Sequence, residues 1–420
     1  MTSISLSATN VRRRAISATT VGRIVTALPV LFLAFDCAIK FTHVDAVAQS
    51  MNQLGYTPDS APVIGLLELV CLAIYLVPRT AVLGAVLLTG YLGGRPVRAL
   101  TSGTEAIEIA LLAAGVGAGD EVITSAMSFC ATANMICRVG AHPVFVDVDL
   151  DTRNLSLEQA EAAITDRTRA ILPVHFAGLP VDLDALYGLA RRYELRVIED
   201  AAHAIGSSFK GQRIGSRGDL VCFSFHPNKN LTTGEGGAIV ASSAKELEHI
   251  ERARFHGIAR GAPGELDVLF PGMKANMSDI AACIGIGQLS RLDQFNSRRR
   301  ALAGRYFELW ARDCPVRLPA RGDEGHSWHM FAPLLPLEKA GATRAQFIRA
   351  MDELGIGVGV HYQAIHTFSA YRKLGWREGM FPNAERIGRE TITLPLFPAM
   401  RDSDVERVVG AVNRVLGAAA

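Results

Sequence analysis

The sequence from residue 98 onward predicts an α/β fold, with a mostly parallel central sheet and helices on both faces. Two observations predict it. Short apolar runs typical of buried strands alternate with helical stretches, which is the pattern of sheets covered on both sides. Polar motifs follow several of these runs, and ligands of such sheets bind outside the carboxyl ends of the strands. The first 94 residues have a different composition and predict a hydrophobic helical segment.

The strand-like runs and helical stretches alternate along the α/β region. Helical periodicity separates several of the runs, and apolar residues recurring every three to four positions place one face of each helix on the sheet. The predicted strands are residues 121–125, 143–148, 170–175, 196–198, 219–225 and 237–241, and the predicted helices include residues 105–114, 157–165 and 184–193.

Composition excludes several classes of function. The formal net charge is only +2 over 420 residues, so no basic field favours nucleic acid as a partner. The seven cysteines are dispersed, without a CxxC pair or a His/Cys ligand spacing. We therefore predict reduced thiols in a cytoplasmic setting and no metal site.

Three apolar runs dominate the first 94 residues, at residues 24–35, 61–78 and 81–94. A bilayer-spanning helix needs about 20 mostly apolar residues, so the second run approaches that length and the third falls short. Asp36 and Glu68 lie in this apolar region. Ionisable groups in such surroundings are often functional; the alternatives are that these two are relics of an ancestral protein or that they face a partner helix.

This segment resembles the DoxX-like family of small bacterial membrane proteins over residues 21–94. The resemblance rests on GRIVTALPVLFLAFDCAIKF, LGY, GLLELVCLAIYLVPRT and LLTGYLGG. It implies membrane association through residues 22–94, although the family's fourth span has no counterpart. Arginines near the N-terminus favour a cytoplasmic start, and three full spans would then place the rest of the chain outside the cytoplasm. Either the third run does not span, or the segment does not insert as in its relatives.

The first motif of the α/β region is Ser102-Gly103-Thr104-Glu105-Ala106, followed by an apolar helical pattern. Small residues leave backbone N–H groups open at a helix start, and the helix dipole there favours an anion such as phosphate. Serine and threonine before a helix are also common N-caps. The motif by itself leaves both interpretations open.

The second motif, VIEDAAH, ends a buried strand with Glu199 and Asp200, and His203 follows three residues after Asp200. A carboxylate at a strand end can pair with a protonated pyridine nitrogen, which keeps a pyridine-type cofactor electron-withdrawing. The alternatives are a carboxylate that binds magnesium or a ribose, or one that caps a helix.

The third motif, SFHPNKN followed by TTGEGG, places Lys229 in a turn beyond a buried strand, five residues after Ser224. A lysine amine can form a Schiff base with an aldehyde, and a desolvated site lowers its pKa for that role. Ser224 can hydrogen-bond a phosphate. A lone lysine in a loop is usually solvated, so the neighbouring motifs decide the interpretation.

In this order the three motifs resemble fold type I pyridoxal-phosphate (PLP) enzymes, and specifically the DegT/StrS family of sugar aminotransferases, from about residue 98 to 417. Further blocks carry the resemblance: PVFVDVD, PVHFAGLPVD, PGMKANMSDIAACIGIGQL, HSWHMF, GVHYQAIH and LPLFP. It implies a large PLP-binding domain at residues 95–300 and a smaller α+β domain at residues 301–420, after the hydrophobic segment 1–94.

The resemblance also implies a role for each matching residue. Lys229 would bind the cofactor aldehyde and move protons, Asp200 would hold the pyridinium nitrogen, and His203 would contact the ring hydroxyl. The other positions would stack on the ring (Phe129), cradle the phosphate (Gly103, Thr104, Glu105 and Ser224), reach the partner's site in a homodimer (Asn276 and Lys274) or face the substrate (His329 and His361). Packing alone is the alternative for Phe129 and His329.

The implied reaction moves an amino group from glutamate to a nucleotide-linked keto sugar, for cell-envelope polysaccharides or natural-product glycans. The KANM and SWHMF motifs favour a 4-keto substrate such as a UDP-4-keto-pentose or a 4-keto-6-deoxyhexose. Lys229 favours transamination over dehydration, because the family's dehydratases carry histidine at that position.

One departure from the family leaves alternatives open. Family members carry a proline-containing opening and helices before the SGT motif, whereas here the DoxX-like segment precedes it, with a join near residues 94 and 95. Loss of that opening would uncover apolar surface at the dimer interface. The chain would then be a chimera that binds the cofactor with weak or no turnover, or a membrane protein with a passenger domain.

Overall fold

The computed structural model describes residues 95–261, 265–310, 316–339 and 341–417, together with residues 35–36, 38–42, 47–49, 51, 57, 60–63 and 65–66. The chain forms two compact units, Met1–Pro78 and Arg79–Ala420. Most of the three N-terminal apolar runs lies outside the described residues, so membrane association stays a prediction. Among the described residues, no helix combines the length and the apolar character needed to cross a bilayer.

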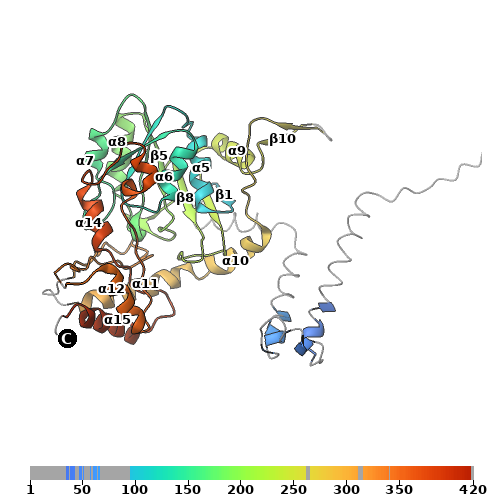
Figure 1. Cartoon of the computed structure of the whole chain (residues 1–420). Helices are drawn as coiled ribbons and strands as arrows, with labels where there is room; N and C mark the ends of the chain where they lie inside the picture. The colour runs from blue at the N-terminus through green and yellow to red at the C-terminus, as the bar shows by residue number, and fades with distance from the viewer. Residues whose placement is uncertain are drawn as a thin grey trace, which may run out of the picture. The chain divides into compact units, whose positions relative to one another are not determined.

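A seven-stranded sheet forms the centre of the second unit (Figure 1), with the strand order β1-β9-β8-β5-β4-β2-β3. β8, β5, β4, β2 and β3 run parallel, whereas β9 is antiparallel to both β8 and β1. Every strand of this sheet except β9 therefore ends at the same edge. The strands are β1 (Val97–Leu100), β2 (Glu121–Ser125), β3 (His142–Val146), β4 (Thr168–Leu172), β5 (Arg196–Asp200), β8 (Leu220–Ser224) and β9 (Gly237–Val240).

One face of the sheet is covered by α5 (Gly103–Ala113), which contacts β8, β9 and β5. Its sequence GTEAIEIALLA is apolar along most of its length, so the helix is stabilised by burial against the sheet. Ile109 packs there in a cluster that includes Ile198 of β5 and Leu220 of β8. α6 (Ala131–Arg138) and α9 (Ala244–Ala253) contact α5 on this side.

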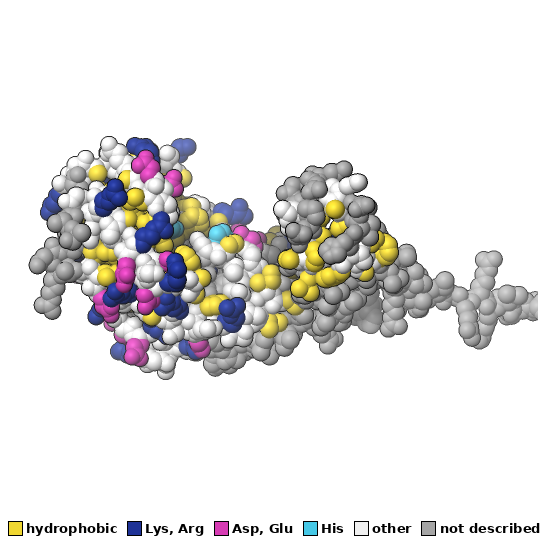
Figure 2. All heavy atoms as spheres, turned by 90° about the horizontal axis from the view of Figure 1, so that it is seen from below, with side chains coloured by type: hydrophobic (Ala, Val, Ile, Leu, Met, Phe, Trp, Pro, Cys, Tyr) yellow, Lys and Arg dark blue, Asp and Glu magenta, His cyan; other side chains and the backbone are white. Residues whose placement is uncertain are grey.

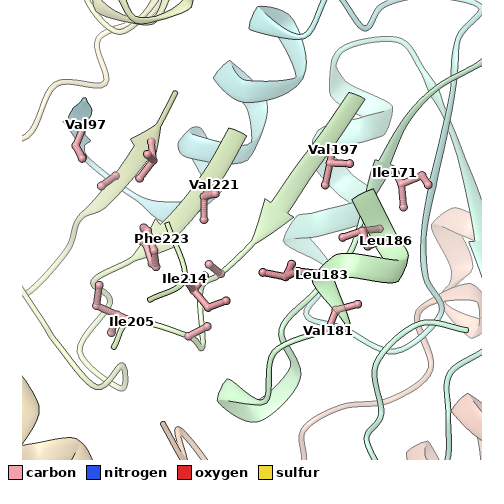
Figure 3. Packing of buried hydrophobic residues seen from close by; sticks show 14 of the residues in the cluster. Val97, Ile171, Val181, Leu183, Leu186, Val197, Ile205, Ile214, Val221 and Phe223 are labelled. Carbon is pink, nitrogen blue, oxygen red and sulfur yellow. The ribbon is translucent and has the colours of Figure 1, made fainter. Parts of the chain in front are cut away.

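The opposite face carries α8 (Leu183–Arg192), which contacts β5 and α7 (Leu157–Ala162). The side chain of Asp182 caps α8 by accepting two backbone N–H groups, and apolar residues then recur at helical spacing. Figure 3 shows Leu186 of α8 beside Val197 and Ile171 of the sheet. β2, β8 and β9 are buried along their whole length, which is typical of strands that are covered on both faces.

The C-terminal part packs separately around Phe331, in an apolar cluster drawn from residues 302–416. α11 crosses the predicted boundary between residues 300 and 301, so a domain division there stays a prediction. The remaining elements are α10 (Asp279–Leu289), α11 (Leu292–Leu309), α12 (Arg344–Glu353), α13 (Ser369–Arg372), α14 (Pro382–Glu390), α15 (Asp402–Val415), the 3-10 turns η2 (Phe176–Gly178) and η3 (Ile365–Thr367), and the short pairs β6 (Ser208–Phe209) with β7 (Gln212–Arg213) and β10 (Ile258–Arg260) with β11 (Leu266–Val268).

The described sheet confirms the predicted mostly parallel α/β fold, and the predicted bounds differ by no more than three residues. Residues 173–175, predicted as the end of a strand, lie beyond β4 and keep only an isolated parallel bridge between Val174 and Asp200. β1 was not predicted, because four residues are too few to show alternation. The antiparallel direction of β9 was also missed, since strand direction depends on pairing and leaves no local pattern.

Candidate active site

A cavity of about 260 Å³, called the narrow cavity below, lies where β2, β4, β5 and β8 end. Its walls come from segments that are far apart in sequence and meet because these strands end at one edge of the sheet. Most of the predicted site residues line it: Gly103, Thr104, Phe129, Asp200, His203, Ser224, Lys229 and His361.

One end of the narrow cavity is the start of α5. The Ser102 hydroxyl accepts the backbone N–H of Glu105 at 3.1 Å and so caps the helix. Gly103 follows, and a Cβ at that position would lie 2.6 Å from the Cβ of Ser224. Only glycine therefore lets the helix start approach β8 this closely. The remaining N–H groups, the helix dipole and the Ser224 hydroxyl form a site suited to a phosphate.

Asp200 ends β5 with its carboxylate almost fully buried, at 5% exposure. One carboxylate oxygen accepts the Thr132 hydroxyl at 2.8 Å, and the other accepts the backbone N–H of Ala202 at 3.1 Å. Burial raises the pKa of Asp200, while these hydrogen bonds and the positive charge of Lys229 act in the opposite direction. The carboxylate is therefore held in one orientation in a place where a cationic partner is favoured.

Lys229 lies in the turn after β8, and its backbone N–H donates to the carbonyl of His226 at 2.9 Å. Burial lowers the pKa of its amine to about 8, partly offset by the Asp200 carboxylate. Within the described part of the chain, the amine makes no side-chain hydrogen bond or ion pair. An amine with this pKa is uncharged often enough near neutral pH to attack an aldehyde.

Stacked rings form the inner wall of the narrow cavity. The ring of His203 lies 4.4 Å from that of His329 and 6.1 Å from that of Tyr362, measured between centroids. Burial, together with the nearby positive charge of Lys229, lowers the pKa of both histidines well below the usual range. His203 Nε2 lies 3.2 Å from the Tyr362 hydroxyl, while its Nδ1 is buried without a hydrogen-bond partner in the described structure. A neutral imidazole with one open nitrogen is thus available to a ligand hydroxyl.

A second space, called the wide hollow below, adjoins the same lysine. Its volume is about 950 Å³, and its walls include Asn228, Lys229, His329 and Arg291 of the turn before α11. Asn228 and Lys229 line both spaces. His329, predicted to face the substrate, therefore lines the wide hollow, and its ring also stacks on the ring of His203.

Three predicted site residues line neither space in this subunit. The Glu105 carboxylate accepts the hydroxyls of Thr101 and of Ser102, the latter at 3.1 Å, and it does not line the narrow cavity. Lys274 and Asn276 lie on a segment that pairs with the end of β1. Lys274 is exposed, contacts the side-chain oxygen of Asn276, and stands 4.7 Å above the ring of Phe255.

Sequence reasoning missed Thr132 and Tyr362. Thr132 lies 68 residues before the carboxylate it contacts, and no local pattern connects the two positions. Tyr362 follows His361 in the VHYQAIH motif, so its position next to a predicted site residue was the available signal. His361 itself is held by a contact of 2.8 Å between its Nδ1 and the Thr393 hydroxyl.

Comparison with known proteins gives a consistent result. The profile of the DegT/DnrJ/EryC1/StrS aminotransferase family matches residues 86–413. Spr1654 of Streptococcus pneumoniae, in its PLP-form, is 30% identical with a TM-score of 0.75, and 81% of this chain and 92% of that chain are covered. DesV of S. venezuelae is 31% identical with a TM-score of 0.76, with coverage of 82% and 91%. The chain belongs to the DegT/DnrJ/EryC1/StrS aminotransferase family.

The chain is also similar to the solved structure of PseC of Helicobacter pylori, an aminotransferase involved in the biosynthesis of pseudoaminic acid. It is 25% identical with a TM-score of 0.76, and 81% of this chain and 91% of that chain are covered. As a member of this family, the chain is a PLP-dependent sugar aminotransferase, and its cofactor is pyridoxal phosphate.

The profile of the DoxX-like family matches residues 24–118, which confirms the predicted resemblance of the N-terminal segment. The two family matches overlap at residues 86–118 instead of meeting near residues 94 and 95. The overlap contains β1 and α5, which are integral to the sheet and to the narrow cavity. Of this shared stretch, the structure describes residues 95–118, which are folded as part of the aminotransferase.

Proposed function

We propose that this chain transfers an amino group from glutamate to the 4-keto carbon of a nucleotide-linked sugar. One observation carries the proposal: Lys229, with its lowered pKa, lies in a narrow cavity that also contains the buried carboxylate of Asp200 and the helix start at Gly103. An amine, an acid and an anion site in one small space are what a phosphorylated pyridine aldehyde requires.

The lining of the narrow cavity fits PLP. Asp200 would hold the pyridinium nitrogen, and Ser224, Gly103 and Thr104 would hold the phosphate. The open Nδ1 of His203 would meet the ring hydroxyl, since it is a buried polar atom that needs a partner. Phe129 would cover one ring face; it is 54% exposed in one subunit, which leaves room for a ligand beside it.

Lys229 would both anchor the cofactor and move the proton. When bound, PLP withdraws electrons from the carbon that gains or loses the amine. The Lys229 amine, kept partly uncharged by burial, would then take a proton from that carbon and return it at the next position. The neutral rings of His203 and His329 line the space without adding a competing positive charge.

The nucleotide part of the substrate would supply binding energy remote from the reacting carbon. His361 and His329, each near Lys229, would face the sugar. His329 is buried and His361 is half-buried. Burial lowers the pKa of both imidazoles, so they would act as neutral hydrogen-bonding groups. PLP and nucleotide sugars are cytoplasmic compounds, and we therefore expect the catalytic part of the chain on the cytoplasmic side, whether or not residues 22–94 associate with a membrane.

We further propose that two copies complete each other's sites. Lys274 and Asn276 line neither space in their own subunit and would reach the partner's phosphate or substrate. α10, which begins three residues later, is apolar all round, and Ile280 and Ile284 are 52% and 45% exposed. Figure 2 shows hydrophobic side chains reaching the surface among Lys and Arg side chains. Apolar surface of this kind is typical of an interface between subunits.

The decisive experiment is an absorbance measurement on the purified full-length chain, followed by product analysis. With added PLP we expect a visible band, which glutamate bleaches and which a nucleotide-linked 4-keto sugar restores, with an amino sugar detected by mass spectrometry. Bleaching by another amino acid alone would overturn glutamate as donor. A band that no amino donor bleaches would favour the alternative of a cofactor-binding protein without turnover.

Subunit mixing tests the shared site. Lys229→Ala and Asn276→Ala each remove one component, and a mixed dimer of the two would contain one intact site. We expect both homodimers to lose most activity and their co-expressed mixture to regain a large part of it. No recovery in isolated mixed dimers would place Asn276 outside the partner's site.

A further inference from the structure

Two motif residues have no part in the proposed chemistry, although both lie next to it. His175 follows β4 in the PVHFAGLPVD motif, and Glu199 precedes Asp200 in β5. Both side chains are fully buried, and His175 Nε2 lies 2.8 Å from Glu199 Oε2. A buried carboxylate is costly unless it is fully hydrogen-bonded, so its presence next to the site calls for a function.

The hydrogen bonds around this pair fix its protonation pattern. The backbone N–H of Val181 donates to His175 Nδ1 at 3.1 Å, so Nδ1 accepts and Nε2 carries the proton that is donated to Glu199. The Tyr187 hydroxyl donates to the other carboxylate oxygen at 2.7 Å and accepts the backbone N–H of Asp219 at 2.7 Å. Each carboxylate oxygen and each ring nitrogen thus has a partner.

The backbone around the carboxylate leaves space only for these partners. Gly218 has a φ of +115°, and a Cβ there would lie 2.4 Å from Glu199 Oε1 and 2.8 Å from the Tyr187 hydroxyl. Tyr187 comes from α8, whose Leu183 and Leu186 cover the same face of the sheet (Figure 3). The carboxylate therefore lies in a dry site on the α8 side of the sheet.

Side chains alternate along a strand, so Asp200 points to the opposite face, into the narrow cavity. The two faces are linked through the backbone. The N–H of His175 donates to the carbonyl of Asp200 at 3.1 Å, and the N–H of Asp200 donates to the carbonyl of Pro173 at 2.9 Å. His175 thus makes two hydrogen bonds to the end of β5. Its backbone N–H bonds to Asp200, and its ring bonds to the side chain of Glu199.

We infer that His175, Glu199 and Tyr187 form a positioning network for Asp200, which holds the cofactor-facing carboxylate in register from the far side of the sheet. The inference rests on the proposed function of Asp200. A displacement of about 1 Å at a catalytic group is enough to reduce its effect strongly. β5 ends at Asp200, whose backbone is paired with Cys222 of β8 on one side and bridged to Val174 on the other. The network supplies side-chain hydrogen bonds at that end.

The test uses variants of the full-length chain. Tyr187→Phe removes both hydrogen bonds of that hydroxyl, to Glu199 and from the backbone N–H of Asp219. Tyr193→Phe is the matched control, since Tyr193 is the residue that ends the same helix and its hydroxyl donates to the surface residue Glu161. Because His175→Leu alone would leave an unpaired buried carboxylate and lose folded protein, it is combined with Glu199→Leu and Tyr187→Phe, which leaves an apolar but filled site. His175→Gln is the conservative variant, since its amide can donate and accept as the ring does.

The readouts are the PLP dissociation constant and the midpoint of the pH titration of the bound cofactor's visible band, on protein shown to be folded by circular dichroism. We expect the apolar triple variant to bind PLP about tenfold more weakly and to shift the midpoint by about half a pH unit or more. Tyr187→Phe should change the dissociation constant and the midpoint less than the triple variant does. His175→Gln should keep both quantities near their wild-type values, and Tyr193→Phe should leave both unchanged. A folded triple variant with wild-type values would overturn the network while leaving the proposed function intact. Absence of a band in wild type would overturn both.

Discussion

The narrow cavity and the wide hollow meet at Lys229 and differ in almost every other respect. The first is about 260 Å³, lined by the backbone of Gly103, hydroxyl side chains, one buried carboxylate and the stacked rings of His203 and Tyr362. The second is about 950 Å³ and has arginine, glutamine and phenylalanine side chains from the α11 side. The polar groups of the narrow cavity can fix the orientation of a small ligand, whereas the wide hollow has the volume of a typical small-molecule site.

The difference indicates how the chemistry is divided. Groups whose pKa values are shifted by burial gather in the narrow cavity, which is where a cofactor would be held. Lys229 alone among the proposed catalytic residues is reached from both spaces. We therefore expect substitutions of Lys229 to affect both cofactor binding and turnover. Substitutions in the narrow cavity should affect cofactor binding and chemistry, and substitutions in the wide hollow should affect the entry of other molecules.

The largest effect should come from Lys229→Ala. It removes both the anchor and the proton carrier, so turnover should fall by about 10³-fold or more, and the visible band should disappear. Lys210→Ala, an exposed lysine paired with Asp184, is the control. Because the wide hollow leads to the same position, we expect primary amines as large as butylamine to restore part of the activity. Rescue limited to methylamine would mean that the hollow is no route to the reacting atoms.

The pH dependence of cofactor uptake should be nearly as large. Burial lowers the pKa of Lys229 to about 8, so the amine is protonated below that pH and free above it. Because only the free amine attacks the aldehyde, the uptake rate should rise about tenfold per pH unit from pH 6 and level off above about 8. Stopped-flow absorbance at a fixed PLP concentration measures this uptake rate. A rate still rising at pH 10 would mean that the lysine keeps its ordinary pKa.

The sequence was enough to predict that the main site residues lie close together. Asp200 and Ser224 each end a buried apolar run, and parallel strands end at one edge, so their convergence with Lys229 follows from the pattern alone. The helix start at Gly103 follows from the small residues before an apolar helix. These features are local, and local patterns carry the information on both strand ends and helix starts.

The remaining features depend on contacts that no local pattern records. The Thr132 hydroxyl reaches Asp200 across the space between α6 and β5, and the stack of His203, His329 and Tyr362 joins three distant segments. Glu105 matched a phosphate-binding motif, yet its carboxylate accepts the hydroxyls of Thr101 and Ser102 and lies outside the narrow cavity. Long-range packing decides between such alternatives, because a side chain's neighbours are set by the fold and not by its motif.

A change in the narrow cavity alone should have an intermediate effect. Asp200→Asn keeps the shape and the hydrogen bond with Thr132 but removes the charge that would face the pyridinium nitrogen. A hydrogen bond to a charged group contributes about 1.5–3 kcal/mol, so turnover should fall about 10- to 100-fold while PLP still binds. Asp184→Asn, on the surface of α8, is the control. Unchanged turnover would place the pyridine nitrogen elsewhere.

The smallest effect, and the most direct comparison of the two spaces, should come from a pair of matched substitutions. Phe129 lines the narrow cavity and Phe397 lines the wide hollow, and they are 54% and 50% exposed. An aromatic ring stacked on another contributes about 0.5–1.5 kcal/mol beyond its buried area. Phe129→Leu should therefore weaken PLP binding about 2- to 10-fold, whereas Phe397→Leu should leave it unchanged, as measured by absorbance titration. Equal effects of the two substitutions would mean that the cofactor extends into the wide hollow, and that the division of chemistry between the two spaces is wrong.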